Sequence, residues 1–415
     1  MGLFDFFGRK REDEAKEAEL RKEEAEKDSA AAQKEAHPGF RIPEIRPING
    51  MKAGGEDAPC GEESIGRERK EELCGLIWES RLKYETVREL TTQELLFLMT
   101  AMEKAQIEKP LENYEENHQI LYSEILNRVR SAEKMSVLYD LTTGYPFLES
   151  GLCCVYLEQD RAKLAAEMYA KQFRKLNAVE VPLYTDMPDG RKKSFFDYLG
   201  YLGATWLLLD NGWYRARFKA GDVVNSIQWE ETPQKEVKNP KLFFAGLNLT
   251  QEMRWTVDYE KRKEILGRRQ FEAYTALRMS RLLVPVITPE GTAPDEHGKY
   301  TLKEGEQLRI PLAKDGQGNE FVPVFTDSPE FSRAFGKKPE IRPAIVEYSK
   351  LIPTMTGKKG LIVNPAGLKL AFSLQDLAGM ENAIAAAAKK AEEKKAEKKA
   401  EEKAEEKTEK KTGDI

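Results

Sequence analysis

The chain has 415 residues, which is enough for two or three domains. Its formal net charge is −5, so composition gives no general case for nucleic-acid binding. No run of about 18 apolar residues occurs, so we expect no transmembrane helix. The chain turns strongly charged from Arg9 onward, so we expect no secretory signal. We therefore expect a cytoplasmic protein.

Residues 1–67 are expected to form a disordered N-terminal segment and linker. The opening MGLFDFFGRKR places four large apolar side chains before three basic ones. Residues 1–11 are therefore either a weak anchor for a membrane surface or partner groove, or a plain disordered start. The Pro- and Gly-rich stretch 37–61 is expected to be a linker, or alternatively a docking segment.

Residues 68–134 are predicted to be a helical region. A capping-box signature, Thr91 to Glu94, precedes apolar residues at helical spacing. Pro110 breaks that pattern, and a second apolar periodicity begins near Ile120.

Residues 135–232 are predicted to form an α+β domain. The apolar run 153–157 indicates a strand that leads into a helix, and 205–209 indicates another strand. Asp210-Asn211-Gly212 follows it as a hairpin turn, because Asn-Gly favours type I′ geometry.

Four cysteines occur at spacings that fit neither a zinc site nor a secreted disulfide framework. They are Cys60, Cys74, Cys153 and Cys154. Buried free thiols are the simplest interpretation, and a reactive Cys153 or Cys154 is the alternative.

Residues 233–280 are predicted to be a linker and a helix. The stretch 235–239 is polar, 242–255 is expected to be a small packing segment, and 259–280 is expected to be helical.

Residues 281–382 are predicted to form a second α+β domain. Its strand 321–325 contains Pro323, which favours an edge or a bulge. Ser328 is predicted to cap the next helix, with Pro329 at its first position.

The end of that domain reads as strand, turn and strand. Asn364-Pro365-Ala366-Gly367 has the residues of a type I turn between the strands 361–363 and 368–372. A capped short helix starts at 373–376. The Lys/Glu/Ala-rich tail 383–415 is expected to be a solvated or coiled-coil helix, or disordered.

The segments VPVFTD and GLIVNPAGLKL, followed by a short helix containing Asp376-Leu377, resemble the SseB family of bacterial proteins. The resemblance covers about residues 281–379. It implies an α+β domain, and it brings no known catalytic residue to this chain.

Residues 209–218 and 363–372 have the same length and pattern, and Asp222 then falls where Asp376 falls. We therefore predict two tandem SseB-like α+β domains of mixed sheet and helix, the first divergent, preceded by the helical region. Two such copies could pack side by side or exchange an edge strand.

No catalytic signature is recognised. The three histidines, His37, His118 and His297, lie in a linker, on a helix and in a loop. We predict no catalytic, cofactor-binding or metal-binding residue, and the DNG and NPAG turns are interpreted as structural. Whether the protein is an enzyme stays open, and the sequence favours a protein without catalytic activity.

Three functions are compatible with these features. The leading hypothesis is a non-catalytic protein-binding or adaptor module, because β edges and aromatic residues expected to be exposed suit peptide docking. Those aromatic residues are Trp206, Trp213 and Tyr214. The alternatives are a sulfur- or serine-metabolism accessory protein with a reactive cysteine, and a peripheral membrane protein held by residues 1–11.

Overall fold

The computed structural model describes residues 63–386 and residue 389, apart from 189, 191, 211, 225–236, 288–308, 337 and 339. The predictions for residues 1–62, for His297 and for most of the tail 383–415 lie outside these residues. The chain divides into two compact units. The first unit holds the described residues up to 224 together with Trp255–Tyr259, and the second unit holds 237–254 and the residues from Glu260 onward.

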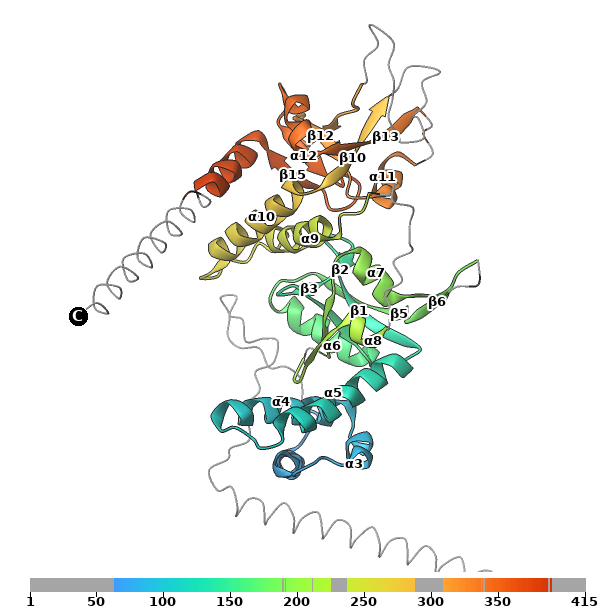
Figure 1. Ribbon diagram of the computed structural model, residues 1–415, viewed down its shortest axis with the longest axis vertical. Helices are drawn as coiled ribbons and strands as arrows, with labels where there is room; N and C mark the ends of the chain where they lie inside the picture. Colours follow the sequence, from blue (N-terminus) through green and yellow to red (C-terminus); the bar gives the residue numbers. More distant parts are fainter. Residues whose placement is uncertain are drawn as a thin grey trace, which may run out of the picture. The chain divides into compact units, whose positions relative to one another are not determined.

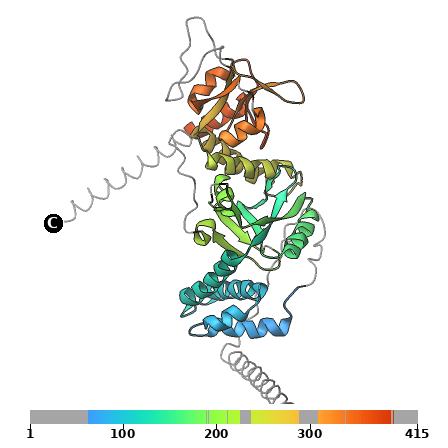
Figure 2. The same ribbon diagram turned by 90° about the vertical axis from the view of Figure 1, so that its right-hand side faces the viewer.

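The first unit begins with helices, as the sequence predicts (Figure 1). They are α2 (Arg67–Gly75), η2 (Leu76–Trp78), α3 (Tyr84–Glu89), α4 (Thr92–Glu108) and α5 (Tyr114–Ser131). The predicted capping box is present at the start of α4, where the Thr91 and Glu94 side chains each accept a hydrogen bond from the other's backbone N–H. Figure 2 shows these helices gathered at one end of the unit's sheet.

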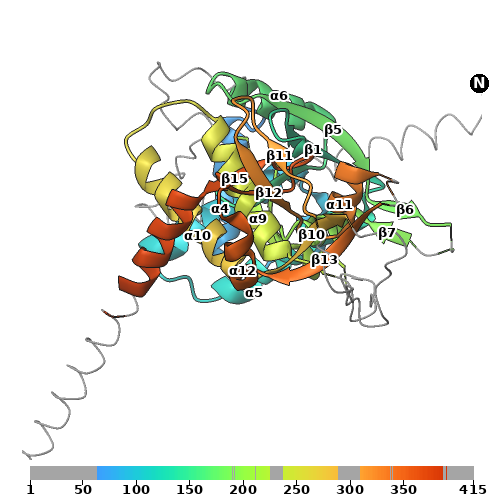
Figure 3. The ribbon, with the colours of Figure 1, turned by 90° about the horizontal axis from the view of Figure 1, so that it is seen from above.

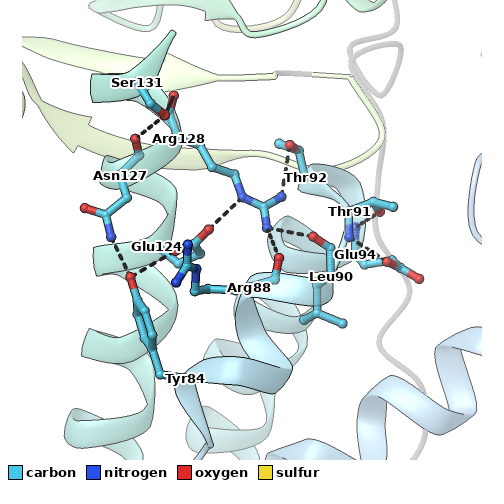
Figure 4. Close-up of polar contacts among 10 residues, drawn as sticks. All are labelled: Tyr84, Arg88, Leu90, Thr91, Thr92, Glu94, Glu124, Asn127, Arg128 and Ser131. Atoms are coloured by element: carbon cyan, nitrogen blue, oxygen red, sulfur yellow. Dashed lines mark hydrogen bonds and ion pairs between the residues drawn. The ribbon is translucent and has the colours of Figure 1, made fainter.

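The side chain of Arg128 on α5 joins three of these helices (Figure 4). Its guanidinium donates to the Glu124 carboxylate at 3.1 Å, to the Thr92 hydroxyl at 3.2 Å and to the Leu90 carbonyl at 2.6 Å. Tyr84 donates to the other oxygen of Glu124 at 3.2 Å. The bond to Leu90 satisfies a carbonyl just beyond the end of α3, so the charge of Arg128 lies where a helix C-terminus favours it.

A mixed sheet follows the helices. Its strands are β1 (Lys134–Asp140), β2 (Tyr145–Pro146), β3 (Leu148–Glu149), β4 (Leu152–Tyr156), β5 (Leu176–Pro182), β8 (Trp206–Leu209) and β9 (Ala216–Lys219). Strand β1 pairs antiparallel with β5 and with β4, β4 pairs parallel with β8, and β8 pairs antiparallel with β9. The parallel pair requires a crossover, which begins with helix α6 (Gln159–Ala170).

The rest of the first unit completes that crossover and the end of the sheet. It comprises the β6–β7 hairpin (Tyr184–Asp186 and Lys192–Ser194), α7 (Phe195–Tyr201) and α8 (Ala220–Val223). Trp255, which also belongs to this unit, donates its indole N–H to the Gln172 carbonyl at 2.7 Å. A core cluster centred on Phe147, Cys154 and Tyr169 fills the space between α6 and the sheet.

The second unit also opens with two helices, α9 (Pro240–Arg254) and α10 (Arg262–Arg278). The sequence predicts α10, but it predicts only a small packing segment where α9 lies. Its strands are β10 (Arg281–Ile287), β11 (Ala313–Lys314), β12 (Glu320–Val324), β13 (Ile341–Glu347), β14 (Gly360–Val363) and β15 (Leu370–Ser373). Its remaining helices are α11 (Ser328–Phe335), α12 (Tyr348–Leu351), η3 (Ile352–Met355) and a last helix over 374–386.

In this unit β10 pairs antiparallel with β13, β12 pairs parallel with β14, and β14 pairs antiparallel with β15. A bridge between Leu283 and Phe325 links β10 to β12. Seen from above, β15, β12, β10 and β13 follow one another across the unit (Figure 3). Both units are thus mixed α+β, which confirms the predicted fold class.

Pro323 favoured an edge or a bulge, and of these two alternatives the edge is wrong, because β12 lies inside this arrangement. On one side it pairs with β14 over its last four residues. On the other side its partners are β11 at Phe321 and β10 at Phe325, so the ladder is interrupted around Pro323. Proline is tolerated there because no hydrogen bond of the β-ladder requires the N–H that proline lacks.

Candidate functional site

The candidate site lies where the parallel strands β12 and β14 of the second unit end. Val324 pairs with Val363 in register, and each strand continues directly into one of the two sequence motifs, Thr326-Asp327 and Asn364 to Gly367. Ligands of open α/β sheets bind outside the carboxyl ends of the strands, so this end of the sheet is the candidate site.

Asn364 connects the two strand ends by its backbone and its side chain. Its N–H donates to the Val324 carbonyl at 2.9 Å, its Oδ1 accepts from the Thr326 N–H at 3.0 Å, and its Nδ2 donates to the Thr326 hydroxyl at 2.9 Å. Asn364 is fully buried and has a φ of +48°, a left-handed conformation that asparagine tolerates better than most residues.

The same hydrogen-bond chain continues into helix α11. The Thr326 hydroxyl donates to Asp327 Oδ2 at 2.5 Å, and Asp327 Oδ1 accepts from the Glu330 N–H at 2.9 Å. Asp327 is therefore the N-cap, and the prediction that Ser328 caps this helix is wrong. The carboxylate of Asp327 satisfies a free N–H of the first turn, so the cap falls one residue earlier.

The predicted turn Asn364 to Gly367 is present, because the Gly367 N–H donates to the Asn364 carbonyl at 2.9 Å. It closes one side of an open pocket of about 250 Å³. The lining residues are Pro311, Leu312, Ala313, Pro323, Ala334, Phe335, Pro365 and Ala366. Pro323, beside the interruption of the ladder, is thus one of the walls of the pocket.

None of these lining side chains can ionise, ligate a metal or act as a nucleophile. Phe335 is held in place by aromatic contacts, with its ring centre 5.6 Å from that of Phe325 and 5.2 Å from that of Phe331. Such a rigid apolar wall can bury an apolar group by exclusion of water, and it offers no group for acid–base chemistry.

The first unit has a corresponding residue in Asp210, after β8. Its φ is also +48°, its N–H donates to the Val155 carbonyl at 2.9 Å, and its Oδ1 accepts from the Leu157 N–H at 3.0 Å. Its Oδ2 accepts from the Gln93 side chain at 3.0 Å. Burial raises the pKa of the Asp210 carboxyl to about 7, because the charged form is poorly solvated there.

The cysteines that suggested a redox alternative are inside the protein. Cys153 and Cys154 are both fully buried, and loss of solvation raises the pKa of each thiol far above its ordinary value. The same cause raises the pKa of Cys74 to about 12. Thiolate chemistry is disfavoured under these conditions. Cys60 lies outside the described residues.

Other residues singled out in the sequence are placed as follows. Trp206 is 45% exposed and Trp213 is half-buried, but Tyr214 is fully buried, so its predicted exposure is wrong. Tyr214 packs edge-on against Phe97 of α4, with ring centres 5.5 Å apart. His118 is half-buried and contacts Glu103 at 3.1 Å.

The described residues also bear on metal binding and on membrane insertion. Within them, no group of three or more His, Cys, Asp or Glu side chains is arranged to hold a metal ion. No helix in the same ranges is both long enough and apolar enough to cross a membrane.

Residues 266–378 match the family model of the SseB protein N-terminal domain. The matched segment begins within α10 and includes the candidate site, in agreement with the resemblance of the two motifs. Comparison with curated proteins and with solved structures returned no match.

The pocket itself was not predicted. The sequence shows the Thr326-Asp327 and Asn364 motifs as part of the resemblance to the SseB family, and it predicts only a structural role for the turn. Local sequence could not reveal the pocket, because its walls come from four separate segments, around residues 312, 323, 335 and 366.

Proposed function

We propose that this SseB-domain protein is a non-catalytic binding module that recognises a protein partner in the cytoplasm through the pocket at the end of β12 and β14. The observation that carries the proposal is the composition of that pocket. Its walls are apolar and open to solvent, and they rest on the buried network of Asn364, Thr326 and Asp327. A preformed apolar pocket on a rigid frame suits recognition.

The first carboxylate after the end of β12 supports binding over catalysis. Asp327 is only 3% exposed, and both of its oxygens accept hydrogen bonds, one from Thr326 and one from the Glu330 N–H. A general acid or base must reach the proton that it transfers, and this carboxylate is already engaged in its cap.

The other two hypotheses receive less support. The accessory role with a reactive cysteine needs an accessible thiolate, and both Cys153 and Cys154 are buried. The role of residues 1–11 in membrane attachment lies outside the described residues, and it stays a prediction to be tested by removing that segment.

We further propose that the first unit is a divergent copy of the second. In each, helices precede the sheet, and the last of them ends three residues before the first strand: Ser131 before Lys134, and Arg278 before Arg281. The four main strand contacts then have the same order and directions, and one crossover joins the parallel pair. Asp210 and Asn364 occupy matching positions with matching hydrogen bonds.

Site-specific photo-cross-linking in cells tests the proposed function. The full-length chain would carry p-benzoylphenylalanine in place of Ala366 at the pocket, or in place of Gly379 on the last helix as the matched control. We expect a discrete cross-linked protein from position 366 and none from position 379. Absence of any product at 366, or the same products from both positions, would contradict the proposal.

A further inference from the structure

The pocket of the second unit has a counterpart in the first unit that is already filled. The registers of the two parallel strand pairs define the correspondence, because Val155 pairs with Leu209 as Val324 pairs with Val363. Cys154 precedes Val155 as Pro323 precedes Val324, so Cys154 of the first unit corresponds to Pro323, which lines the pocket of the second.

The helices that follow the strands continue the correspondence. Ala165 and Ala166 lie 10 and 11 residues after Val155, at the positions that Ala334 and Phe335 hold after Val324. Cys154 and Ala165 belong to the core cluster of the first unit, and Ala166 packs against that cluster. The helical wall of the pocket is thus a core surface in the first unit.

The turn after the second parallel strand supplies the difference. Trp213 lies three residues after Asp210, where the second unit has Gly367 three residues after Asn364. The half-buried indole of Trp213 packs against the cluster that contains Cys154 and Ala165. The first unit therefore covers this surface with its own tryptophan, while the second unit has no side chain at the equivalent position and leaves the pocket open.

We infer that the pocket of the second unit accepts an aromatic side chain of a protein partner, in the place that Trp213 takes in the first unit. The inference rests on the proposed function and specifies its ligand. The volume of about 250 Å³ is sufficient, since an apolar cavity of about 150 Å³ already binds benzene in another protein. Aromatic residues anchored in pockets are also the residues that dominate binding energy at interfaces.

Charge near the pocket indicates what flanks the aromatic anchor. Three exposed basic residues lie close in sequence to the lining residues. Arg309 is two residues before Pro311, Lys338 is three after Phe335, and Lys369 is three after Ala366. The exposed carboxylate of Asp315 is engaged by Asn319 within its own turn, through contacts of 2.8 and 2.9 Å. The partner segment recognised here is therefore an aromatic residue flanked by Asp or Glu, because opposite charge favours its encounter and orientation.

The probe is a synthetic pentapeptide with a central tryptophan and two acidic residues on each side, added to the full-length protein with labelled alanine methyl groups. We expect saturable shifts of the Ala334 and Ala366 methyl signals, with Ala344 of β13 as the reference outside the pocket. Replacing the central tryptophan by alanine should weaken binding by about tenfold or more. Raising the salt concentration to about 0.5 M should weaken it further.

Gly367→Trp tests the assignment by giving the second unit its own equivalent of Trp213. The substitution is compatible with the backbone, since Gly367 does not have a positive φ. We expect loss of peptide binding with an otherwise unchanged spectrum. Gly379→Trp, at an exposed position with open space around it, is the matched control and should bind normally. Should Gly367→Trp fail to fold, Ala366→Glu is the second variant. Its carboxylate at the pocket should repel the acidic peptide, so we expect loss of binding.

Each outcome separates the inference from the proposed function. If position 366 cross-links to a partner but the acidic tryptophan peptide shifts neither methyl signal, the function stands and the aromatic–acidic ligand is wrong. If the peptide binds equally to Gly367→Trp, the pocket is not its site and the inference fails. If the peptide binds as expected but no partner cross-links at position 366, the pocket chemistry stands and the proposed function fails.

Discussion

At the scale of single residues, Asn364 determines whether the two strand ends of the candidate site stay joined. Asn364→Ala removes two side-chain bonds, of 3.0 and 2.9 Å, and leaves the buried Thr326 N–H without its acceptor. It also places alanine at a φ of +48°. We expect a loss of about 2–4 kcal/mol in unfolding free energy, measured by urea titration.

Asn319→Ala is the matched control for that substitution. Asn319 also makes amide contacts, to Asp315 and Gln317, but in an exposed turn. Water replaces such contacts, so a change of less than about 1 kcal/mol is expected. An equally small effect at Asn364 would show that its network does not hold the site.

Asp210 is the residue of the first unit that corresponds to Asn364, and its side chain can ionise. Its folded-state pKa of about 7 lies above the ordinary value of 3.8, so the folded protein binds this proton more tightly than the unfolded chain. The stabilisation is complete below about pH 4 and is lost as the pH rises through 7, with a difference on the order of 4 kcal/mol. Glu158 raises this pKa as well, while Leu157 N–H, Arg161 and Gln93 oppose the shift.

Asp210→Asn therefore should stabilise the protein at pH 8 and flatten the dependence of urea midpoints between pH 5 and pH 8. The amide can still accept from Leu157 and pair with the Gln93 amide. Asn364→Asp is the reciprocal variant and should create a new loss of stability with rising pH. If the urea midpoints depend on pH in the same way in the wild type and in Asp210→Asn, Asp210 is not the source of that dependence.

Phe173 carries a conformational cost that glycine would remove. It follows α6 with a φ of +62° and is 68% exposed, and its N–H donates to the Ala170 carbonyl at 2.9 Å. This is the left-handed position at a helix end where glycine is usual. Phe173→Gly should raise the unfolding free energy by about 1 kcal/mol, whereas Phe173→Ala keeps the strained φ and should give no such gain. Chemical denaturation of both variants measures the difference, and a stabilising Phe173→Ala would contradict the explanation.

At the scale of elements, local signals predicted some parts of the fold and missed others for identifiable reasons. Helix α4 was predictable because Thr91 and Glu94 form a local capping box. The turn after β14 was predictable because Asn364 and Gly367 suit it. Helix α9 was missed because it lacks a polar face: Asn248, Thr250 and Gln251 are buried together with its leucines. When polar positions are buried together with apolar ones, the sequence shows no clear helical period.

The packing of α3, α4 and α5 gives a prediction at this scale. Arg128→Met keeps a long apolar side chain but removes the guanidinium contacts to Glu124, Thr92 and Leu90 (Figure 4). Glu124 would be left buried without its charge partner, so a loss of about 3–5 kcal/mol in unfolding free energy is expected.

Arg81→Met is the control for this change. Its ion pair with Glu116 spans 3.2 Å, but the Arg81 side chain is 72% exposed, so its loss should cost less than about 1 kcal/mol. Similar effects of the two substitutions in guanidinium denaturation would show that Arg128 is an ordinary surface residue.

At the scale of the whole molecule, the proposed duplication changes how the two units are understood. The copies share a frame but differ at the position three residues after the buried Asp210 or Asn364, where Trp213 fills one surface and Gly367 leaves the other open. Under the proposed duplication, glycine in place of tryptophan accounts for the open pocket of the second unit. The proposal therefore assigns recognition to the second unit, whereas the first unit covers the corresponding surface with Trp213.

Hydrogen exchange on the full-length protein tests whether the units unfold separately. Each has its own buried core, centred on residues such as Phe147 and Tyr169 in the first unit and Phe325 and Phe331 in the second. Asn364→Ala should therefore increase amide exchange in β12, β14 and α11 while β1, β4 and α6 keep their protection. The reciprocal Asp210→Asn, at pH 8, should slow exchange in β4 and β8 only. Uniform changes across both units would mean that the chain unfolds as one cooperative body, and the division of roles between the copies would then lack a physical basis.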